Sequence, residues 1–295
     1  MSDLDMTSRY LSPMEPLVSG IESAEILDQP ATLLARAVRG VLSPGKLKDG
    51  LSGTWLGHAV HPMLTDVVIG SFLSASALDL VAGEDGQPAS ERLIMIGMAA
   101  YGPTAAAGAS DWIDGEFDDR VKRVGIVHAS GNLTALTLYT ASLIARRRGA
   151  QTRGKLLAAA GASVLLVGGY LGGHLSLRRG IGVDETVFDP GSDDWRPAAD
   201  AAQLPEGQPT RVVVDETPVL LLKAGERIYA IHDRCSHRGC SLVDGNVEGH
   251  EIVCSCHFSR FDLRDGSVIR GPATAPQPTF QVRESDGVLE VRRVG

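Results

Sequence analysis

The sequence predicts two domains, an all-α four-helix transmembrane bundle followed by an all-β antiparallel sandwich. Four long apolar segments lie between residues 59 and 175, whereas residues after about 210 alternate in polarity or are rich in β-branched side chains. A stretch rich in Pro, Gly and acidic residues separates the two parts. We therefore expect an N-terminal segment (1–43), a membrane domain (44–177), a linker (178–208) and a β domain (209–295).

Composition excludes some classes of protein. The 295 residues include 36 acidic and 28 basic ones, giving a net charge of −8, and no basic domain stands out, which argues against a nucleic-acid binder. All four cysteines lie in the expected β domain, so a disulfide framework is not expected elsewhere. The first twenty residues lack a basic segment followed by an apolar run, so we expect no signal peptide.

Residues 23–42 predict an amphipathic helix that is broken at Pro30. Arg36 and Arg39 lie away from the apolar face, which consists of Ile26, Leu27, Leu33, Leu34, Ala37, Val38 and Val41. A basic amphipathic helix suits a membrane surface, and it equally suits packing against its own domain. Both interpretations remain open.

The four apolar segments cover residues 59–81, 93–109, 124–145 and 156–175. Each is near the roughly 20 residues that a membrane-spanning helix needs, and the loops between them are short. Glycines are frequent in the second and fourth segments, as in membrane helices that approach closely. The first two segments are weaker by hydropathy, and the third and fourth are almost free of charge. A soluble bundle is the alternative, but we expect a multi-pass protein of the cell membrane with four spans in the lipid bilayer.

The motif Gly-His-Ala-Val-His-Pro occupies residues 57–62, at the entry to the first apolar segment. On this motif, residues from about 44 to 175 resemble a family of small four-helix membrane domains of unknown function. The resemblance implies a fold but no established activity.

Four histidines are expected at one face of the membrane: His58, His61, His128 and His174. A pair on facing helices could supply the axial ligands of a b-type haem, could contact a quinone headgroup, or could be structural. For haem, the expected pair is His61 with His128 or His174. Asp66 and Asp79 lie within the first apolar segment and should be paired or face water.

Basic residues bear on orientation, because they gather on the cytoplasmic side of membrane proteins. The third loop carries Arg146, Arg147, Arg148, Arg153 and Lys155. The opposite face carries more, namely Arg36, Arg39, Lys46, Lys48, Arg120, Lys122, Arg123, Arg178 and Arg179. We therefore expect both termini and the β domain on the cytoplasmic side. The linker could let the β domain swing, but we expect it to be packed.

Two short stretches of the β domain carry the chemistry. Cys235 and His237 form a C-x-H motif, and Cys254 and His257 form a C-x-x-H motif. Two thiolates and two imidazoles from two loops are the ligand set of a [2Fe–2S] cluster in which Cys holds one iron and His the other. Structural zinc is the competitor, but zinc half-sites usually pair like residues. Each half here donates one Cys and one His, which favours the cluster.

Residues from about 212 to 291 also resemble a Rieske ferredoxin-type domain as a whole. The matching stretches include Cys-Ser-His-Arg-Gly-Cys at 235–240, Cys-Ser-Cys-His-Phe-Ser-Arg-Phe-Asp at 254–262 and Gly-Pro-Ala at 271–273. The resemblance implies that the cluster ligands are Cys235, His237, Cys254 and His257. It also implies a disulfide between Cys240 and Cys256, and a third loop at Gly271-Pro272 that covers the cluster.

The resemblance bears on the reduction potential as well. Ser259 matches a hydroxyl that hydrogen-bonds a bridging sulfide in the family. Phe261 stands where high-potential members have Tyr, so one hydrogen-bond donor to a ligand sulfur is missing. Phe258 replaces the Gly that is usual after the second His ligand. We expect a potential within the Rieske range but below its top.

Together these features predict a membrane-anchored Rieske protein that transfers single electrons between the membrane, through quinone or haem, and a protein redox partner. A redox-sensing or accessory protein without net electron transport is the alternative. Electron delivery to an oxygenase is a weaker one, because the chain has no His-rich soluble catalytic domain. Neither part shows a self-contained substrate site, so the sequence does not decide whether the chain is itself an enzyme.

Overall fold

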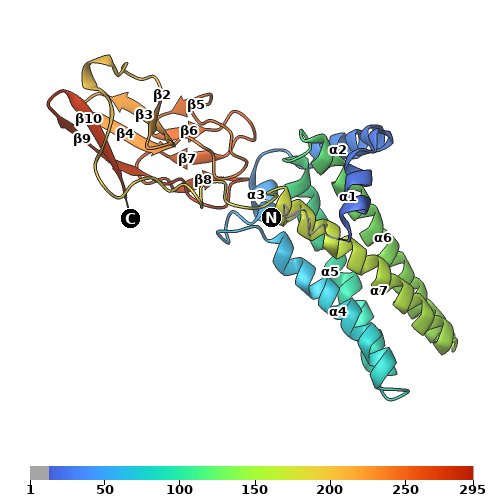
Figure 1. The fold of residues 1–295 in the computed structure, drawn as a ribbon. Coiled ribbons are helices and arrows are strands. Elements are labelled where there is room, and N and C mark those ends of the chain that lie inside the picture. Colours follow the sequence, from blue (N-terminus) through green and yellow to red (C-terminus); the bar gives the residue numbers. More distant parts are fainter. Residues whose placement is uncertain (1–12, 295) are drawn as a thin grey trace, which may run out of the picture.

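The computed structural model describes residues 13–294, in which a helical domain is joined at one end to a β domain (Figure 1). Its helices are α1 (Glu15–Glu22), α2 (Asp28–Val41), α3 (Lys46–Ser52), α4 (His61–Val81), α5 (Gln87–Ile113), α6 (Asp119–Arg147) and α7 (Gln151–Gly173). A 3₁₀ turn (Glu25–Leu27) precedes α2, and α7 continues into a π-helical turn (His174–Arg178).

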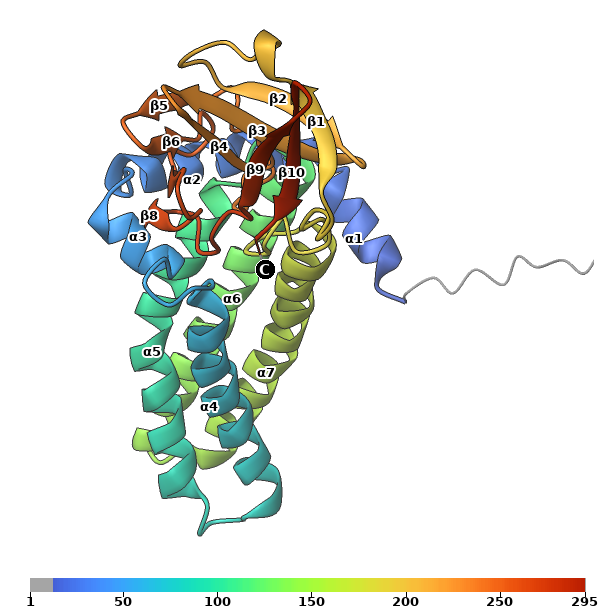
Figure 2. The same cartoon turned by 90° about the vertical axis from the view of Figure 1, so that its left-hand side faces the viewer.

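Helices α4 to α7 form the long bundle, and α1 to α3 gather at the end next to the β domain (Figure 2). Pro62 and Pro88 lie in the first turns of α4 and α5, where proline costs no backbone hydrogen bond. The side chain of Asp118 caps α6 by accepting a hydrogen bond from Arg120 N. In the core, the ring of Phe72 stacks on Tyr139 at 4.2 Å between centroids, and the Tyr139 hydroxyl donates to Phe72 O. The expected four-helix bundle is therefore present.

Three helices of the described residues are long and apolar enough to cross a membrane: α4, α5, and α7 with its extension to Arg178. An 18-residue stretch within each has a mean hydropathy of 1.6, 1.2 and 1.7, respectively. The expectation that the first segment is weak by hydropathy is therefore wrong. Helix α6 does not reach this level, although residues 124–145 carry no charge, because polar residues such as His128, Asn132 and Thr140 interrupt its apolar stretch.

The expected amphipathic helix differs from the structure at Pro30. This residue lies in the first turn of α2 and so begins the helix, which a proline tolerates, and does not break it. Helix α2 buries Ala31 and Ala35 against the bundle, so it packs on its own domain. Leu33 and Val41 remain 59% and 73% exposed, which leaves an outward apolar edge.

The β domain consists of antiparallel strands arranged, within the described residues, as three small sheets. Strands β1 (Arg196–Asp200), β10 (Val288–Arg293) and β9 (Phe280–Ser285) form the first, and β2 (Thr210–Val214), β3 (Thr217–Ala224) and β4 (Arg227–His232) form the second. The third comprises β5 (Asn246–Glu248), β6 (Glu251–Val253), β7 (Arg260–Asp262) and β8 (Val268–Arg270). A short 3₁₀ turn (Ala201–Gln203) follows β1.

Strand β1 lies inside the segment expected to be a linker, because it pairs with β10 at the edge of the first sheet. The remainder of that segment is packed. Thr217 donates to Asp189 at 2.6 Å, Glu185 N donates to Ser236 O at 3.0 Å, and Gly191 lies against the ring of Phe280. The linker is therefore packed against the β domain, as expected.

An ion pair is buried near the end of the bundle that lies away from the β domain. Arg146 of α6 donates to both carboxylate oxygens of Asp79 of α4, with Nη1 2.8 Å from Oδ1. Its Nε donates to Ser142 Oγ at 3.1 Å. The side chains of Arg146 and Asp79 are 0% and 6% exposed. Asp79 is thus paired, as expected, whereas Asp66 is exposed on α4.

Replacing Asp79 by Ala should destabilise the helical domain by about 3–5 kcal/mol, because it leaves the buried guanidinium of Arg146 without its counter-ion. Denaturant unfolding of the detergent-solubilised protein measures the loss. Asp85→Ala, in the exposed loop between α4 and α5, is the control and should cost less than about 0.5 kcal/mol. Equal losses for the two variants would show that the ion pair contributes nothing specific.

Candidate metal centre

Two loops of the β domain present the Cys and His residues of the two motifs. The first follows β4 and closes on itself through hydrogen bonds from Cys235 N to Cys240 O and from Gly239 N to Cys235 O, both 2.8 Å. The second follows β6 and closes through Cys254 N to Ser259 O at 2.9 Å and Phe258 N to Cys254 O at 3.0 Å. The two tight turns direct one Cys of each loop inward.

The backbone explains why a Gly is usual after the second His. Phe258 has a φ of 64°, in the left-handed region that favours Gly. The chain therefore holds a large side chain in a disfavoured conformation beside the second loop. The Phe258 side chain is 49% exposed, so it supplies little burial in return.

The structure brings together all four residues of the two motifs. Cys235 and Cys254 are each 1% exposed, and each thiol shifts the pKa of the other. The rings of His237 and His257 meet edge to face with centroids 4.9 Å apart. Two sulfurs and two imidazoles therefore converge at the end of the β domain that faces the helices.

The two thiols influence each other's ionisation. The hydrogen bond from Cys235 lowers the pKa of the Cys254 thiol to about 7 against the effect of burial. The same contact, together with burial, raises the pKa of Cys235 well above its usual value. A thiolate in the buried pair is thus accessible near neutral pH, and thiolate is the form of cysteine that binds metal.

The imidazoles also suit metal binding. Burial, and then the neighbouring His237, lowers the pKa of His257 to about 4, so its ring is neutral and keeps a lone pair. Nδ1 of His237 and Nε2 of His257 are buried without a hydrogen-bond partner. Buried polar atoms are rarely left unpaired in proteins, so these nitrogens fit a site completed by a metal.

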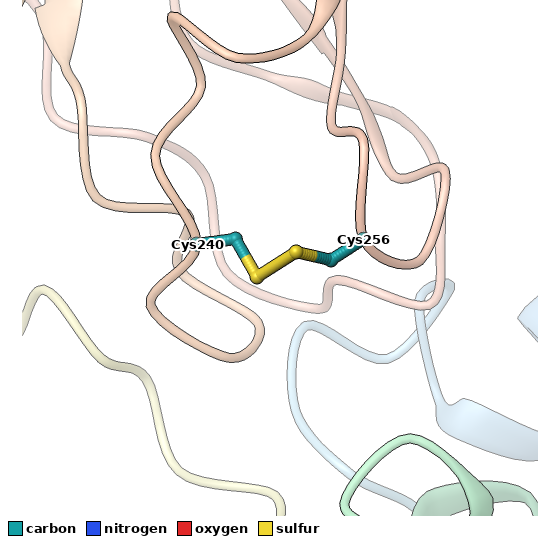
Figure 3. The surroundings of a disulfide bond; sticks show 2 residues. All are labelled: Cys240 and Cys256. Carbon is teal, nitrogen blue, oxygen red and sulfur yellow. A yellow bond between two sulfur atoms is a disulfide. The ribbon is translucent and has the colours of Figure 1, made fainter. Parts of the chain in front are cut away.

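A disulfide joins Cys240 and Cys256, with Cα atoms 6.6 Å apart, and links the two loops (Figure 3). The disulfide implied by the resemblance is therefore present. The sulfurs of Cys240, Cys254 and Cys256 lie within 4.8 Å of one another, but two of them are consumed by the disulfide. The free thiols of Cys235 and Cys254 remain as donors.

The third loop packs against the second through Ser259, which is fully buried and accepts a hydrogen bond from Ala273 N at 3.0 Å. Its own hydroxyl hydrogen is therefore left for another acceptor. Ala273 directly follows Gly271 and Pro272, so this contact fixes the loop expected to cover the cluster. Phe261 is 0% exposed and lies in the hydrophobic core with Leu220 and Ile252.

Gln277 is a residue that the motifs do not reveal. It is 2% exposed; its amide oxygen accepts from Ser236 N at 2.8 Å, and its amide nitrogen donates to His232 O and Arg234 O. Its side chain thereby holds the first ligand loop. An isolated Gln in a loop carries no motif, so sequence reasoning had no signal for it.

The helical domain reaches the ligand end of the β domain through Asp114, which follows α5. Its carboxylate lies 3.3 Å from Nε2 of His237 and 2.9 Å from Nζ of Lys48. Burial raises the pKa of Asp114, but His237 and Lys48 outweigh it and leave the pKa below its usual range. Lys48, expected as a loop charge, is only 3% exposed.

Other contacts complete this interface. Thr54 donates to Ala273 O at 3.1 Å, and Arg238 Nη1 donates to Gly180 O at 2.7 Å. The ring of Phe117, between α5 and α6, lies 6.1 Å from that of His257. A small cavity of about 20 Å³ remains beside His237, bordered by Asp111 of α5, and is large enough for one water molecule.

The four histidines of the helical domain do not form one group. His174 Nε2 lies 2.8 Å from Glu22 Oε1, so this ring is held by a hydrogen bond to a carboxylate. His58 is exposed and contacts the carbonyl of its neighbour Ala59. His61 and His128 both point into helix–helix contacts, with Nδ1 atoms next to Thr104 O and Gly168 O. The pairing of His61 with His174 is therefore not supported.

In comparisons with known proteins, the β domain and the helical domain match two different families. The family described as Rieske [2Fe-2S] domain matches residues 194–281, and the family described as predicted membrane protein (DUF2231) matches residues 57–185. The chain is 31% identical over 98 residues to the anthranilate 1,2-dioxygenase ferredoxin subunit of Burkholderia cepacia, covering 33% of this chain and 91% of the relative.

The chain is also 38% identical over 92 residues to the 3-phenylpropionate/cinnamic acid dioxygenase ferredoxin subunit of Escherichia coli strain K12, covering 30% of this chain and 85% of the relative. Among solved structures, the ferredoxin of carbazole 1,9a-dioxygenase from Nocardioides aromaticivorans IC177 is 32% identical. That match has a TM-score of 0.31 and covers 33% of this chain and 94% of the ferredoxin. Through its C-terminal domain the chain belongs to the Rieske [2Fe-2S] family, and residues 57–185 match the family described as predicted membrane protein (DUF2231).

Proposed function

We propose that this protein is a membrane-anchored Rieske protein that transfers single electrons between a quinone or haem in the membrane and a protein redox partner. One observation carries the proposal. The ligand end of the Rieske domain faces the helical domain, and Asp114 of the helical domain contacts the ring of His237. Electron exchange with the membrane side therefore needs no movement of the Rieske domain.

In this proposal Cys235 and Cys254 hold one iron of the [2Fe–2S] cluster, and His237 and His257 hold the other. The cluster supplies one-electron chemistry at a potential that imidazole ligation raises. The protein's own residues fix the geometry. The Cys240–Cys256 disulfide joins the ligand loops, Gln277 holds the first loop, and Asp114 orients the ring of His237 through Nε2.

We further propose that α4 to α7 cross the bilayer, with the Rieske domain on the cytoplasmic side. Three of these helices are apolar enough to span alone, and α6 packs between them with its polar side chains in helix contacts. Arg146 and Lys48 are buried in ion pairs, so they no longer count among the exposed basic residues that indicate orientation. Each face of the bundle loses one such residue. The remaining basic residues still favour the face that bears the Rieske domain.

A second candidate function is electron delivery to a soluble oxygenase, favoured by the names of the relatives, which are ferredoxin subunits of dioxygenases. The two candidates differ in which face of the Rieske domain exchanges electrons. Delivery to a soluble protein needs an exposed ligand end, but His237 is only 13% exposed beneath Asp114. A redox-sensing role remains the alternative without net transport.

Quinol-driven reduction of the cluster tests the function. In liposomes containing a quinol, the full-length protein should show reduction of its Rieske absorbance, and Asp114→Asn should slow it by disturbing the contact with His237. Reduction by soluble dithionite should be equal in both proteins. Asp85→Asn, which removes the same charge from the far loop, is the matched control. Failure of quinol to reduce the cluster, alongside reduction by a soluble ferredoxin reductase, would favour the second candidate.

Replacing a ligand should abolish the cluster spectrum. We expect His237→Cys and Cys254→Ser to lose the Rieske optical and EPR signals, because each changes the two-sulfur, two-nitrogen ligand set. The exposed His250→Gln variant should retain them. An unchanged spectrum in either ligand variant would disprove the assignment of that residue.

Two substitutions should move the reduction potential in opposite directions. Ser259→Ala removes a buried hydroxyl and should lower the potential, whereas Phe261→Tyr adds a donor and should raise it. A hydrogen bond to a charged acceptor contributes about 1.5 kcal/mol, which corresponds to about 65 mV for one electron. Redox titration followed by circular dichroism measures both shifts. Shifts in the same direction would show that these side chains do not act as hydrogen-bond donors to the cluster.

A further inference from the structure

The two hairpins of the bundle repeat one arrangement around a histidine. In the α4–α5 hairpin, Nδ1 of His61 lies 2.9 Å from the carbonyl oxygen of Thr104. In the α6–α7 hairpin, Nδ1 of His128 lies 2.8 Å from the carbonyl oxygen of Gly168. Each histidine is thus bonded to the backbone of the next helix along the chain.

The residues that surround each histidine ring are also repeated in the two hairpins. Four residues after each carbonyl comes a glycine, Gly108 or Gly172, at which an added Cβ would lie 2.6 or 2.9 Å from the imidazole ring. Each ring therefore needs a glycine on the neighbouring helix. Four residues after each histidine comes a polar side chain near Nε2, with Thr65 Oγ1 at 3.4 Å from His61 and Asn132 Nδ2 at 3.0 Å from His128.

These hydrogen bonds fix the tautomer of both rings. A backbone carbonyl can only accept, so Nδ1 carries the hydrogen and Nε2 of the neutral ring keeps its lone pair. Metal-ligating histidines are oriented in this way, with one ring nitrogen bonded to a carbonyl and the other on the metal. At His61 the lone pair is poorly satisfied, because the single hydrogen of Thr65 is directed to His61 O at 2.9 Å.

The two rings lie in different hairpins of one bundle, and these hairpins pack together through α4 against α7 and α5 against α6. His58 and His174 are not available, since the first is exposed and the second is held by Glu22.

The two available imidazole nitrogens favour haem over a metal ion or a quinone. A bare zinc-type ion needs about four donors, but within residues 13–294 neither ring belongs to a group of three Cys, His, Asp or Glu ligand atoms. A quinone presents carbonyl oxygens, which need hydrogen-bond donors, whereas both Nε2 atoms are acceptors, so only the reduced quinol form could donate to them. A haem iron brings four pyrrole nitrogens and lacks only two axial ligands.

We propose that His61 and His128 are the axial ligands of a b-type haem bound between the α4–α5 and α6–α7 hairpins. Ligation replaces the contacts of the two Nε2 atoms with Thr65 and Asn132, and requires the hairpins to part around the porphyrin.

The site lies beneath the Rieske centre. Thr104, Gly108, Asp111 and Asp114 are three or four residues apart and so share one face of α5. Gly108, against the ring of His61, is six residues from Asp114, or about 9 Å along the helix. The inference rests on the proposed function, in which the haem is the membrane-side partner: one electron leaves ferrous haem and reduces the oxidised cluster.

Titration of haemin into the detergent-purified full-length protein tests the site. We expect a Soret band that saturates at one haem per chain, with a low-spin EPR signal of bis-imidazole type. His61→Ala and His128→Ala should each lose this signal while keeping the Rieske spectrum, which also reports that the chain is folded. His58→Ala is the matched control and should bind haem like the parent protein.

A ligand exchange separates ligation from a structural role. His128→Met should still bind haem, but with the spectrum of His/Met ligation and a higher haem potential. No saturable Soret band, or binding unaffected by the two Ala variants, overturns the haem site. If quinol still reduces the cluster in that case, the proposed function stands without the haem. If quinol reduction needs His61 and His128 but no haem binds, the pair is a quinol site and the haem inference is wrong.

Discussion

The contact on which the arrangement depends is that between the carboxylate of Asp114 and the ring of His237. It joins the helical domain to a candidate cluster ligand, and the buried ammonium of Lys48 balances the charge. A carboxylate and an ammonium this deeply buried are costly unless each is paired. Lys48 and Asp114 pair within the helical domain, so separating the two domains would remove the contact of Asp114 with His237 and expose this ion pair to water.

The same contact shows what the sequence could and could not reveal. The Cys and His motifs locate the ligand loops because the chemistry of an iron–sulfur site limits the residue types and their spacing. The four apolar segments locate the bundle because the thickness of a bilayer limits helix length. Asp114 and Gln277 act through contacts between residues more than 40 positions apart, as Asp114 does with His237 and Gln277 with Arg234. No local sequence pattern indicates such contacts, so they could be identified only from the folded structure.

The differences from expectation have physical causes. Pro30 begins α2 because the first turn of a helix has no hydrogen bond to lose there. Helix α6 carries polar side chains that are satisfied inside the bundle, such as Tyr139 and His128, which a hydropathy window counts only as polar. Strand β1 pairs with the last strand, β10. Because this partner is distant in sequence, nothing in the local sequence distinguishes β1 from the loop around it.

The packed segment between the domains has a consequence for how electrons move. Glu185 is bonded to Ser236 and Gly180 to Arg238, so the segment is fastened to the first ligand loop itself. A Rieske domain that swings must break these bonds at every cycle. In the proposed function these bonds stay intact and the Rieske domain does not move between partners, so the rate of electron exchange across the interface should be insensitive to solvent viscosity.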